Sequence, residues 1–198
     1  MYEYLDNTKK HFLKMQKQMS RVLGKERTET LLFDLSYVDG SETPAEAAAW
    51  ATKLIRRLEE NVEEETIIRI REECACVYTN KYSAYNKKYF KDIRDRSADE
   101  NSYLENIALF LGGRPRIGRK VEFIHGELFT YLGEGRKCGC FVVKKGWEKP
   151  PSATWCRCCQ GSLLSVYRFI LPEKKCRMDI VETLATGAND CVFRARFC

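Results

Sequence analysis

Residues 177–197, RMDIVETLATGANDCVFRARF, decide the fold class that the sequence predicts. Apolar residues recur along both halves of this stretch, and the TGAN segment between them consists of residue types that favour turns and tolerate a positive φ. The pattern predicts two strands, 177–185 and 190–197, joined by a hairpin. Because the strands of a hairpin run antiparallel, the sheet that contains them is predicted to be antiparallel.

Upstream segments supply the rest of this predicted sheet. The apolar residues of 161–170 recur at helical spacing and Pro172 ends that helix, whereas 121–132 and 138–145 read as strands separated by a glycine-containing turn. The predicted order along the chain is therefore β-β-α-β-β. This order favours an antiparallel sheet with a helix packed on it, as in α+β proteins.

The first half of the chain has helical periodicity. Two segments, Thr43-Pro44-Ala45-Glu46 and Ser97-Ala98-Asp99-Glu100, read as capping boxes that open helices. A chain of 198 residues suits one domain with a substantial core. We therefore predict a single α+β domain in which a helical part, residues 1–114, packs on a cysteine-rich α+β part, residues 115–198.

Eight of the ten cysteines lie beyond residue 137, and they include a CxC motif at 138–140 and a CxCC motif at 156–159. Thiols at alternate positions of a strand or a tight turn point the same way, so two such pairs can enclose a soft divalent metal. The expected cofactor is zinc. The predicted ligands are Cys138, Cys140, Cys156 and Cys158, with Cys159 or Cys191 as substitutes.

Two other interpretations of these cysteines remain open, namely disulfides and buried unliganded thiols. The residues after Met1 are not an apolar leader, and no stretch approaches the roughly 20 apolar residues of a membrane span. We therefore expect a cytoplasmic protein without membrane contact, in which thiols stay reduced. Cys74 lies on the apolar face of a predicted helix and is expected in the core, whereas Cys76 stays undecided because residues two apart on a helix point in different directions.

The charge balance does not favour nucleic acid as a partner. The net charge is +6, and the acidic run at 59–65 offsets a basic run at 112–120 that Glu122 and Glu127 follow closely. A run of charges is usually a solvated face. The sequence leaves a homodimer open.

Tyrosines among the lysines of 82–89 form an aromatic stripe at helical spacing. The next predicted helix continues it with Tyr103 and Phe110. At helical spacing such a stripe is more typical of a core or a pocket wall than of a base-stacking surface. We expect a pocket for a small apolar or aromatic molecule between these helices and the sheet. His125 is added to the candidate pocket residues. It is the histidine that remains available, because His11, the other histidine of the chain, is predicted on the polar side of the first helix. The candidate pocket residues are Tyr82, Tyr85, Tyr89, Tyr103, Phe110 and His125.

The segments WCRCCQG at 155–161 and VETLATGANDCVF at 181–193 resemble the 4-vinyl reductase-type domain superfamily. The L-2-amino-thiazoline-4-carboxylic acid hydrolase-like proteins, which resemble it, have the same ending. The resemblance covers about residues 115–197 and implies a small-molecule-binding α+β domain with a zinc ion near C-terminal cysteines, here Cys156, Cys158 and Cys191. The zinc-binding members place a cysteine three residues after a glutamate, whereas here Ala185 follows Glu182, so that pair is broken.

Three functions follow from these patterns. The first is a small-molecule-binding domain in which a cysteine-bound zinc is a structural clip. The second is a hydrolase of the kind that the resemblance implies, which would use a metal-bound water or a thiolate beside Arg157 or His125. The third is an assembly subunit like those of the TRAPP complex, which share the fold that the resemblance implies.

Overall fold

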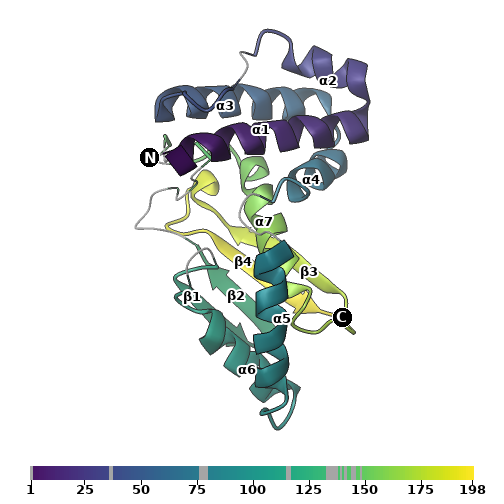
Figure 1. The fold of residues 1–198 in the computed structure, drawn as a ribbon, viewed down its shortest axis with the longest axis vertical. Coiled ribbons are helices and arrows are strands. Elements are labelled where there is room, and N and C mark those ends of the chain that lie inside the picture. Colours follow the sequence, from purple (N-terminus) through teal and green to yellow (C-terminus); the bar gives the residue numbers. More distant parts are fainter. Residues whose placement is uncertain are drawn as a thin grey trace.

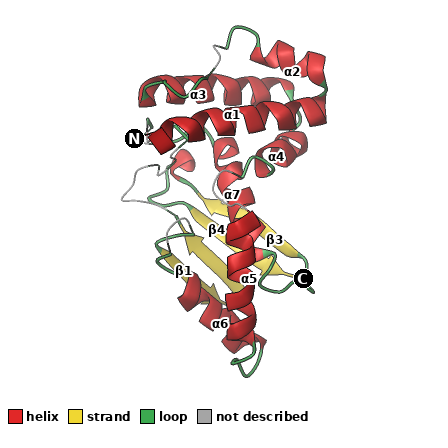
Figure 2. Cartoon of the chain, in the orientation of Figure 1, coloured by secondary structure: helices red, strands yellow, loops and turns green. Residues whose placement is uncertain are grey.

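The computed structural model describes residues 2–35, 38–75, 80–114, 117–132, 138, 140, 142–143, 146–147 and 149–198, and the side chains of all of these except 2–7 and 80–86. Its helices are α1 (Tyr2–Leu23), α2 (Lys25–Leu32), α3 (Pro44–Asn61), α4 (Glu64–Glu72), α5 (Asn80–Arg94), α6 (Glu100–Leu111) and α7 (Ala153–Tyr167). Its strands are β1 (Lys120–Ile124), β2 (Glu127–Tyr131), β3 (Cys176–Glu182) and β4 (Val192–Phe197). The predicted α+β class is confirmed, with helices mostly in the N-terminal part and strands in the C-terminal part (Figure 2).

The four strands form one antiparallel sheet in the order β1-β2-β4-β3, and α7 lies between β2 and β3 along the chain. A two-residue turn joins β1 to β2, in which His125 and Gly126 have φ values of 50° and 82°. Positive φ at both central residues is the signature of the tight turn that matches strand twist. The β3–β4 connection is longer than the predicted hairpin because a 3-10 helix, Leu184–Thr186, interrupts it.

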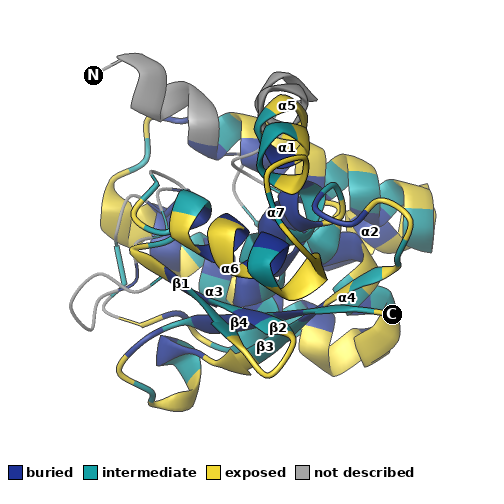
Figure 3. Ribbon diagram, turned by 90° about the horizontal axis from the view of Figure 1, so that it is seen from below, coloured by how far each residue is buried: buried dark blue, intermediate teal, exposed yellow. Residues whose placement is uncertain are grey.

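Two hydrophobic cores share α7. The N-terminal core joins α1–α4 to the first half of α7, and the sheet core joins α5, α6 and the second half of α7 to one face of the sheet. Figure 1 shows α7 descending from the layer of α1–α4 to the sheet, with α5 and α6 beside the strands. In Figure 3, buried segments run through α7 and β4. The helices therefore form two groups: α6 and α7, rather than α1–α4, contact the strands, and α5 packs on α6 and α7.

Local sequence signals explain where several helices begin. Thr43 caps α3 in the predicted capping box, and its side-chain oxygen accepts a hydrogen bond from the backbone N–H of Glu46. The box that opens α6 is formed by Asp99 and Ser102, so the predicted cap at Ser97 is wrong. The Ser97 hydroxyl donates instead to the Ile93 carbonyl, at 2.9 Å.

The start of α7 differs most from the prediction. The helix begins at Ala153, eight residues before the predicted start, so the whole CxCC motif is helical. Pro150-Pro151-Ser152 immediately before it is a helix-start signal, and Trp155, Cys158, Ser162 and Val166 recur at helical spacing. The predicted strand 138–145 is also wrong among its described residues, because Val142 and Val143 lie in a turn.

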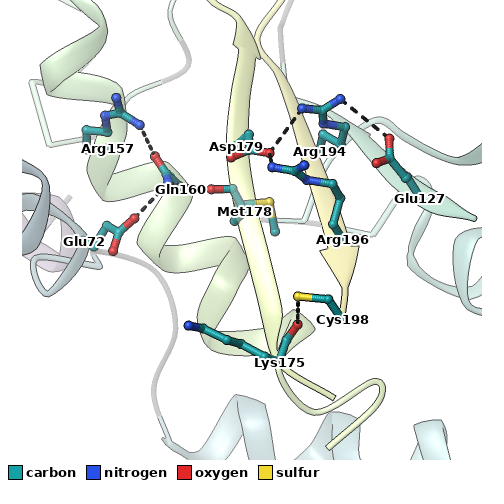
Figure 4. Close-up of polar contacts among 10 residues, drawn as sticks. All are labelled: Glu72, Glu127, Arg157, Gln160, Lys175, Met178, Asp179, Arg194, Arg196 and Cys198. Atoms are coloured by element: carbon teal, nitrogen blue, oxygen red, sulfur yellow. Dashed lines mark hydrogen bonds and ion pairs between the residues drawn. The ribbon is translucent and has the colours of Figure 1, made fainter.

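The backbones of α4 and α7 touch at Gly161. A Cβ atom added there would lie 2.1 Å from the carbonyl oxygen of Glu72, well inside van der Waals contact. Gln160 reinforces the crossing, because its Nε2 donates both to Glu72 Oε1 at 2.8 Å and to the Met178 carbonyl of β3 at 2.7 Å (Figure 4). One side chain thus links α4, α7 and the sheet.

We predict that Gly161→Ala destabilises the protein. Alanine is favoured over glycine in a helix by about 1 kcal/mol, so propensity alone predicts a gain. The clash with α4 is expected to reverse this and to cost about 2 kcal/mol net, as overpacking does elsewhere. Urea unfolding of this variant beside Ser165→Ala, a change one turn further along α7, measures the effect. Equal or greater stability of Gly161→Ala would show that the helices do not touch there.

Candidate functional site

The helical CxCC motif places its sulfurs on different sides of α7. Because each residue turns about 100°, Cys156 and Cys158 point about 200° apart. Cys158 is fully buried in the N-terminal core. Cys156 interacts electrostatically first with Cys191 and then with Cys138. The expectation that Cys156 and Cys158 point the same way therefore fails, because the motif is helical, whereas the predicted ligand set itself stays a prediction.

Cys140 is a thiol with several donors around it. Its Sγ accepts a hydrogen bond from the indole Nε1 of Trp155, with an N–S distance of 3.4 Å. The backbone N–H groups of Val142 and Val143 also donate to it. Donors aimed at one sulfur stabilise the thiolate form, which is the form that binds metals. Cys158 is the titratable neighbour that acts most strongly on Cys140, and it raises the pKa of that thiol.

Burial opposes ionisation of these thiols in the absence of a metal. Desolvation is the main cause that raises the pKa of Cys138 to about 12, with the neighbouring Cys140 as the next cause. Desolvation likewise raises the pKa values of Cys140, Cys156 and Cys191. The thiols are therefore protonated at neutral pH, and a metal would have to displace their protons.

The cysteines surround α7 without forming a finished coordination shell. Among the residues that the structure describes, no three His, Cys, Asp or Glu side chains are placed so that they could hold a metal ion. Cys159 packs between the two cores. Cys76 lies outside the described residues, and Cys74 is a core residue as predicted, since its thiol donates to the Ile70 carbonyl at 3.1 Å.

The sequence did not reveal a buried arginine beside these thiols. Arg71 of α4 is 0 % exposed, and its guanidinium lies 4.4 Å from the centroid of the Trp155 ring. Its Nη2 donates to the Trp155 carbonyl at 2.8 Å, and its Nη1 contacts Met15 Sδ at 3.1 Å and His11 Nε2 at 3.5 Å. The only sequence feature that could have indicated the burial of Arg71 was its position among the apolar residues Ile67, Ile70 and Cys74.

The sequence predicted His11 on the polar side of α1, and this prediction is wrong because the side chain is buried. It packs against Trp155, with ring centroids 5.9 Å apart. Burial is the main cause that lowers its pKa to about 4, and Arg71 and Lys14 lower it further. The imidazole is therefore neutral at physiological pH. The sequence feature that could have indicated this burial is the helical spacing of His11, which lies one turn before Met15 and two turns before Met19, both of which are buried.

The described residues of the predicted aromatic pocket pack against their neighbours. Tyr103 is buried and its hydroxyl donates to the Ile170 carbonyl at 2.8 Å. Tyr89 stacks on Phe110, with ring centroids 5.4 Å apart. The side chains of Tyr82 and Tyr85 lie outside the described set. A depression of about 240 Å³ borders Tyr103 where α5 ends and α6 begins, and a larger one of about 520 Å³ lies at the turn between α1 and α2.

The remaining candidates lie away from the thiols or already have partners. His125 is exposed in the β1–β2 turn rather than in a strand. In the basic run, Arg119 pairs with Asp190, Lys120 pairs with Glu122 at 2.5 Å, and the Arg114 guanidinium lies 3.7 Å from the ring centroid of Phe110. Arg116 is not described.

A charged network covers part of the sheet face that points away from α6 and α7. Asp179 of β3 pairs with Arg194 at 3.3 Å and with Arg196 at 2.6 Å, and Arg194 also reaches Glu127 of β2 at 3.7 Å (Figure 4). These pairs link three strands. On a half-exposed face, such pairs stabilise only weakly, so the network orders the strands more than it stabilises the fold.

We predict that acid destabilises the protein through His11. Between pH 6.5 and about 4 the unfolded histidine binds a proton that the folded one does not. Stability is therefore lost as the pH falls through this window, by about 1.4 kcal/mol per unit. His11→Gln should remove that slope from urea unfolding measured across the window. The matched control, His125→Gln at the exposed turn, should keep it, and equal slopes in all three proteins would contradict the assignment.

Comparison with known proteins gives one match. Residues 11–196 match the model of a family of unknown function, DUF6144. The searches of curated proteins and of solved structures returned no match. Within the described residues, none of the helices combines the length and the apolar character needed to cross a membrane. Because the family model covers nearly the whole chain, this protein belongs to the DUF6144 family.

Proposed function

We propose that this protein is a ligand-binding domain that holds a soft divalent metal, zinc, through cysteines around the first two turns of α7. The observation that carries the proposal is the sulfur of Cys140, which accepts hydrogen bonds from Trp155 and from two backbone N–H groups. Cys138 and Cys158 are its closest electrostatic partners. We assign these three thiols as ligands, with Cys156 or Cys191 as a fourth.

The donor set fits zinc in chemistry. Thiolates are the preferred ligands of zinc, and N–H groups that donate to the sulfur stabilise the bound form. The sulfurs come from the segment before α7 and from α7 itself, so metal binding would tie the two together. Side-chain rotation would have to bring them into tetrahedral geometry. Cys159 packs between the two cores and is left out of the assigned set.

Thiolate catalysis is the less supported alternative. A nucleophilic cysteine needs a lowered pKa and an exposed sulfur. Burial instead raises the pKa of the thiols around α7, so they do not meet this requirement; these thiols are Cys138, Cys140, Cys156 and Cys191. Arg157, the predicted activating residue, is engaged by Gln160 Oε1 at 2.9 Å. These contacts favour a binding domain over the hydrolase that the resemblance implies.

A small organic ligand remains part of the proposal. Its place would be the α5–α6 side of the sheet, where Tyr89 stacks on Phe110 and Phe90 meets Phe110 edge-on. An aromatic or apolar molecule suits these rings. The metal would then hold the α7 end of the domain while the ligand occupied the other.

We predict that the purified protein carries about one zinc ion per chain, and that a strong chelator lowers its melting temperature. Elemental analysis and thermal unfolding with and without chelator measure both. Cys138→Ser and Cys158→Ser should each lose most of the metal. Cys176→Ser is the matched control, because Cys176 is a thiol of β3 that has Cys198 rather than the cluster as its neighbour.

Two results would sink the assignment. Metal-free protein whose melting temperature does not respond to the chelator would leave the thiols unliganded in the core. Metal loss in Cys176→Ser equal to that in Cys158→Ser would show that a general loss of folding, rather than a missing ligand, releases the metal.

A further inference from the structure

Acidic and basic side chains are divided unequally along the chain. Residues 1–79 contain 12 lysines and arginines and 15 aspartates and glutamates, whereas residues 80–198 contain 22 and 13. The part that holds α5, α6 and the sheet therefore has a net charge of +9, and the part that holds α1–α4 has a net charge of −3. Such an asymmetry within one chain indicates an anionic partner for the basic part.

The basic run 112–120, on which the expectation of no nucleic acid partly rests, is not the source of this free charge. Arg119 pairs with Asp190, and Lys120 pairs with Glu122 at 2.5 Å. These ion pairs neutralise the end of the run on the molecule itself. A partner would have to bind other cations.

Such cations lie on a stripe that runs from α5 across the α7–β3 connection, residues 168–175, to the start of β3. They are exposed, and none of them pairs with a carboxylate of the described residues. We call this set the basic stripe, and its members are Lys87, Lys88, Lys91, Arg168, Lys175 and Arg177.

Two contacts hold α5 against the α7–β3 connection and order the stripe. The Lys87 ammonium lies 4.1 Å from the ring centroid of Phe169, and the Arg168 guanidinium lies 5.0 Å from the same centroid. Arg94 pairs with Glu173 at 2.7 Å. Because the cation–π contacts already restrict two cations of the stripe, less side-chain entropy is lost when a partner binds them.

Carboxylates beside the stripe reduce its charge without cancelling it. Asp92 and Asp95 follow Lys88 and Lys91 by one turn of α5, and neither forms an ion pair with these lysines. Six cations therefore face two unpaired carboxylates on the described surface, and the stripe stays positive.

The stripe has charge but no apolar anchor. The exposed large apolar side chains lie away from α5, from residues 168–175 and from the start of β3; among the described residues they are Leu13, Phe33, Leu109, Ile124 and Val181. A protein interface has an apolar centre, and stable membrane docking needs buried apolar area besides charge. The phosphates of a nucleic acid need neither, because the release of counter-ions drives their binding.

We propose that the basic stripe binds nucleic acid through the phosphate backbone, without preference for base sequence. A row of cations that follows the backbone is the electrostatic part of such sites. The stripe was not apparent in the sequence because its members come from three separate segments of the chain. This binding is independent of the metal and of the organic ligand proposed above.

The test measures binding of a fluorescein-labelled single-stranded oligothymidylate of about 20 nucleotides by fluorescence anisotropy, at about 50 and 200 mM salt. With four or more phosphates contacted, the affinity of the parent protein should fall about 50-fold or more between these salt concentrations, since the slope is about 0.7 per phosphate for a single strand. Lys88→Gln/Lys91→Gln should bind about tenfold or more weakly at the lower salt concentration and reduce the slope by about 1.4.

The matched control is Lys17→Gln/Lys25→Gln, which removes two exposed lysines of α1 and α2 and changes the net charge by the same amount. It should bind like the parent. Equal weakening in the two double variants would overturn the proposal, because the response would then be to net charge and not to the stripe.

Two further results would also overturn it. One is a parent protein that does not bind the oligonucleotide at about 50 mM salt. The other is a parent protein that sediments with vesicles of equal parts phosphatidylserine and phosphatidylcholine but does not bind the oligonucleotide, which would assign the stripe to an anionic lipid surface.

Discussion

The fold depends on the crossing of α4 and α7, where the backbones touch because residue 161 is a glycine. A side chain at this position would meet the Glu72 carbonyl at 2.1 Å. The contact fixes the two helices at a separation that ordinary side chains would not allow, and Gln160 links them to β3. Since α7 belongs to both cores, this crossing also sets the position of the α1–α4 layer relative to the sheet (Figure 1).

The same crossing assembles the candidate site. With α4 and α7 held together, Arg71 of α4 and Cys74 just after it face Trp155 and Cys158 of α7, and His11 and Met15 of α1 close the group. Trp155 is the common neighbour, because it also contacts Cys140 and packs edge-on against Trp147, with ring centroids 5.2 Å apart. A buried cation and buried thiols thus share one environment, and this combination supports the proposed metal binding.

The sequence predicted the α+β class, the antiparallel sheet and the core position of Cys74, because these follow from local periodicity and turn residues. It failed where one pattern fits two structures. Alternating cysteines suit a strand as well as a helix, so the start of α7 and the direction of Cys156 were missed. Burial of Arg71 and His11 depends on which helices meet, and a single sequence contains no signal for a crossing that one glycine permits. Their roles therefore emerged only from the three-dimensional contacts.

X-ray absorption at the zinc edge, on protein purified without added metal, tests the central claim most directly. Scattering from the first shell counts the sulfur neighbours of the bound ion without disturbing the fold. Three or more sulfur atoms at about 2.3 Å are the predicted result, the distance being that of zinc–thiolate bonds. A shell of nitrogen and oxygen atoms alone, or no zinc edge at all, would contradict the account and leave the cysteines around α7 as packing residues.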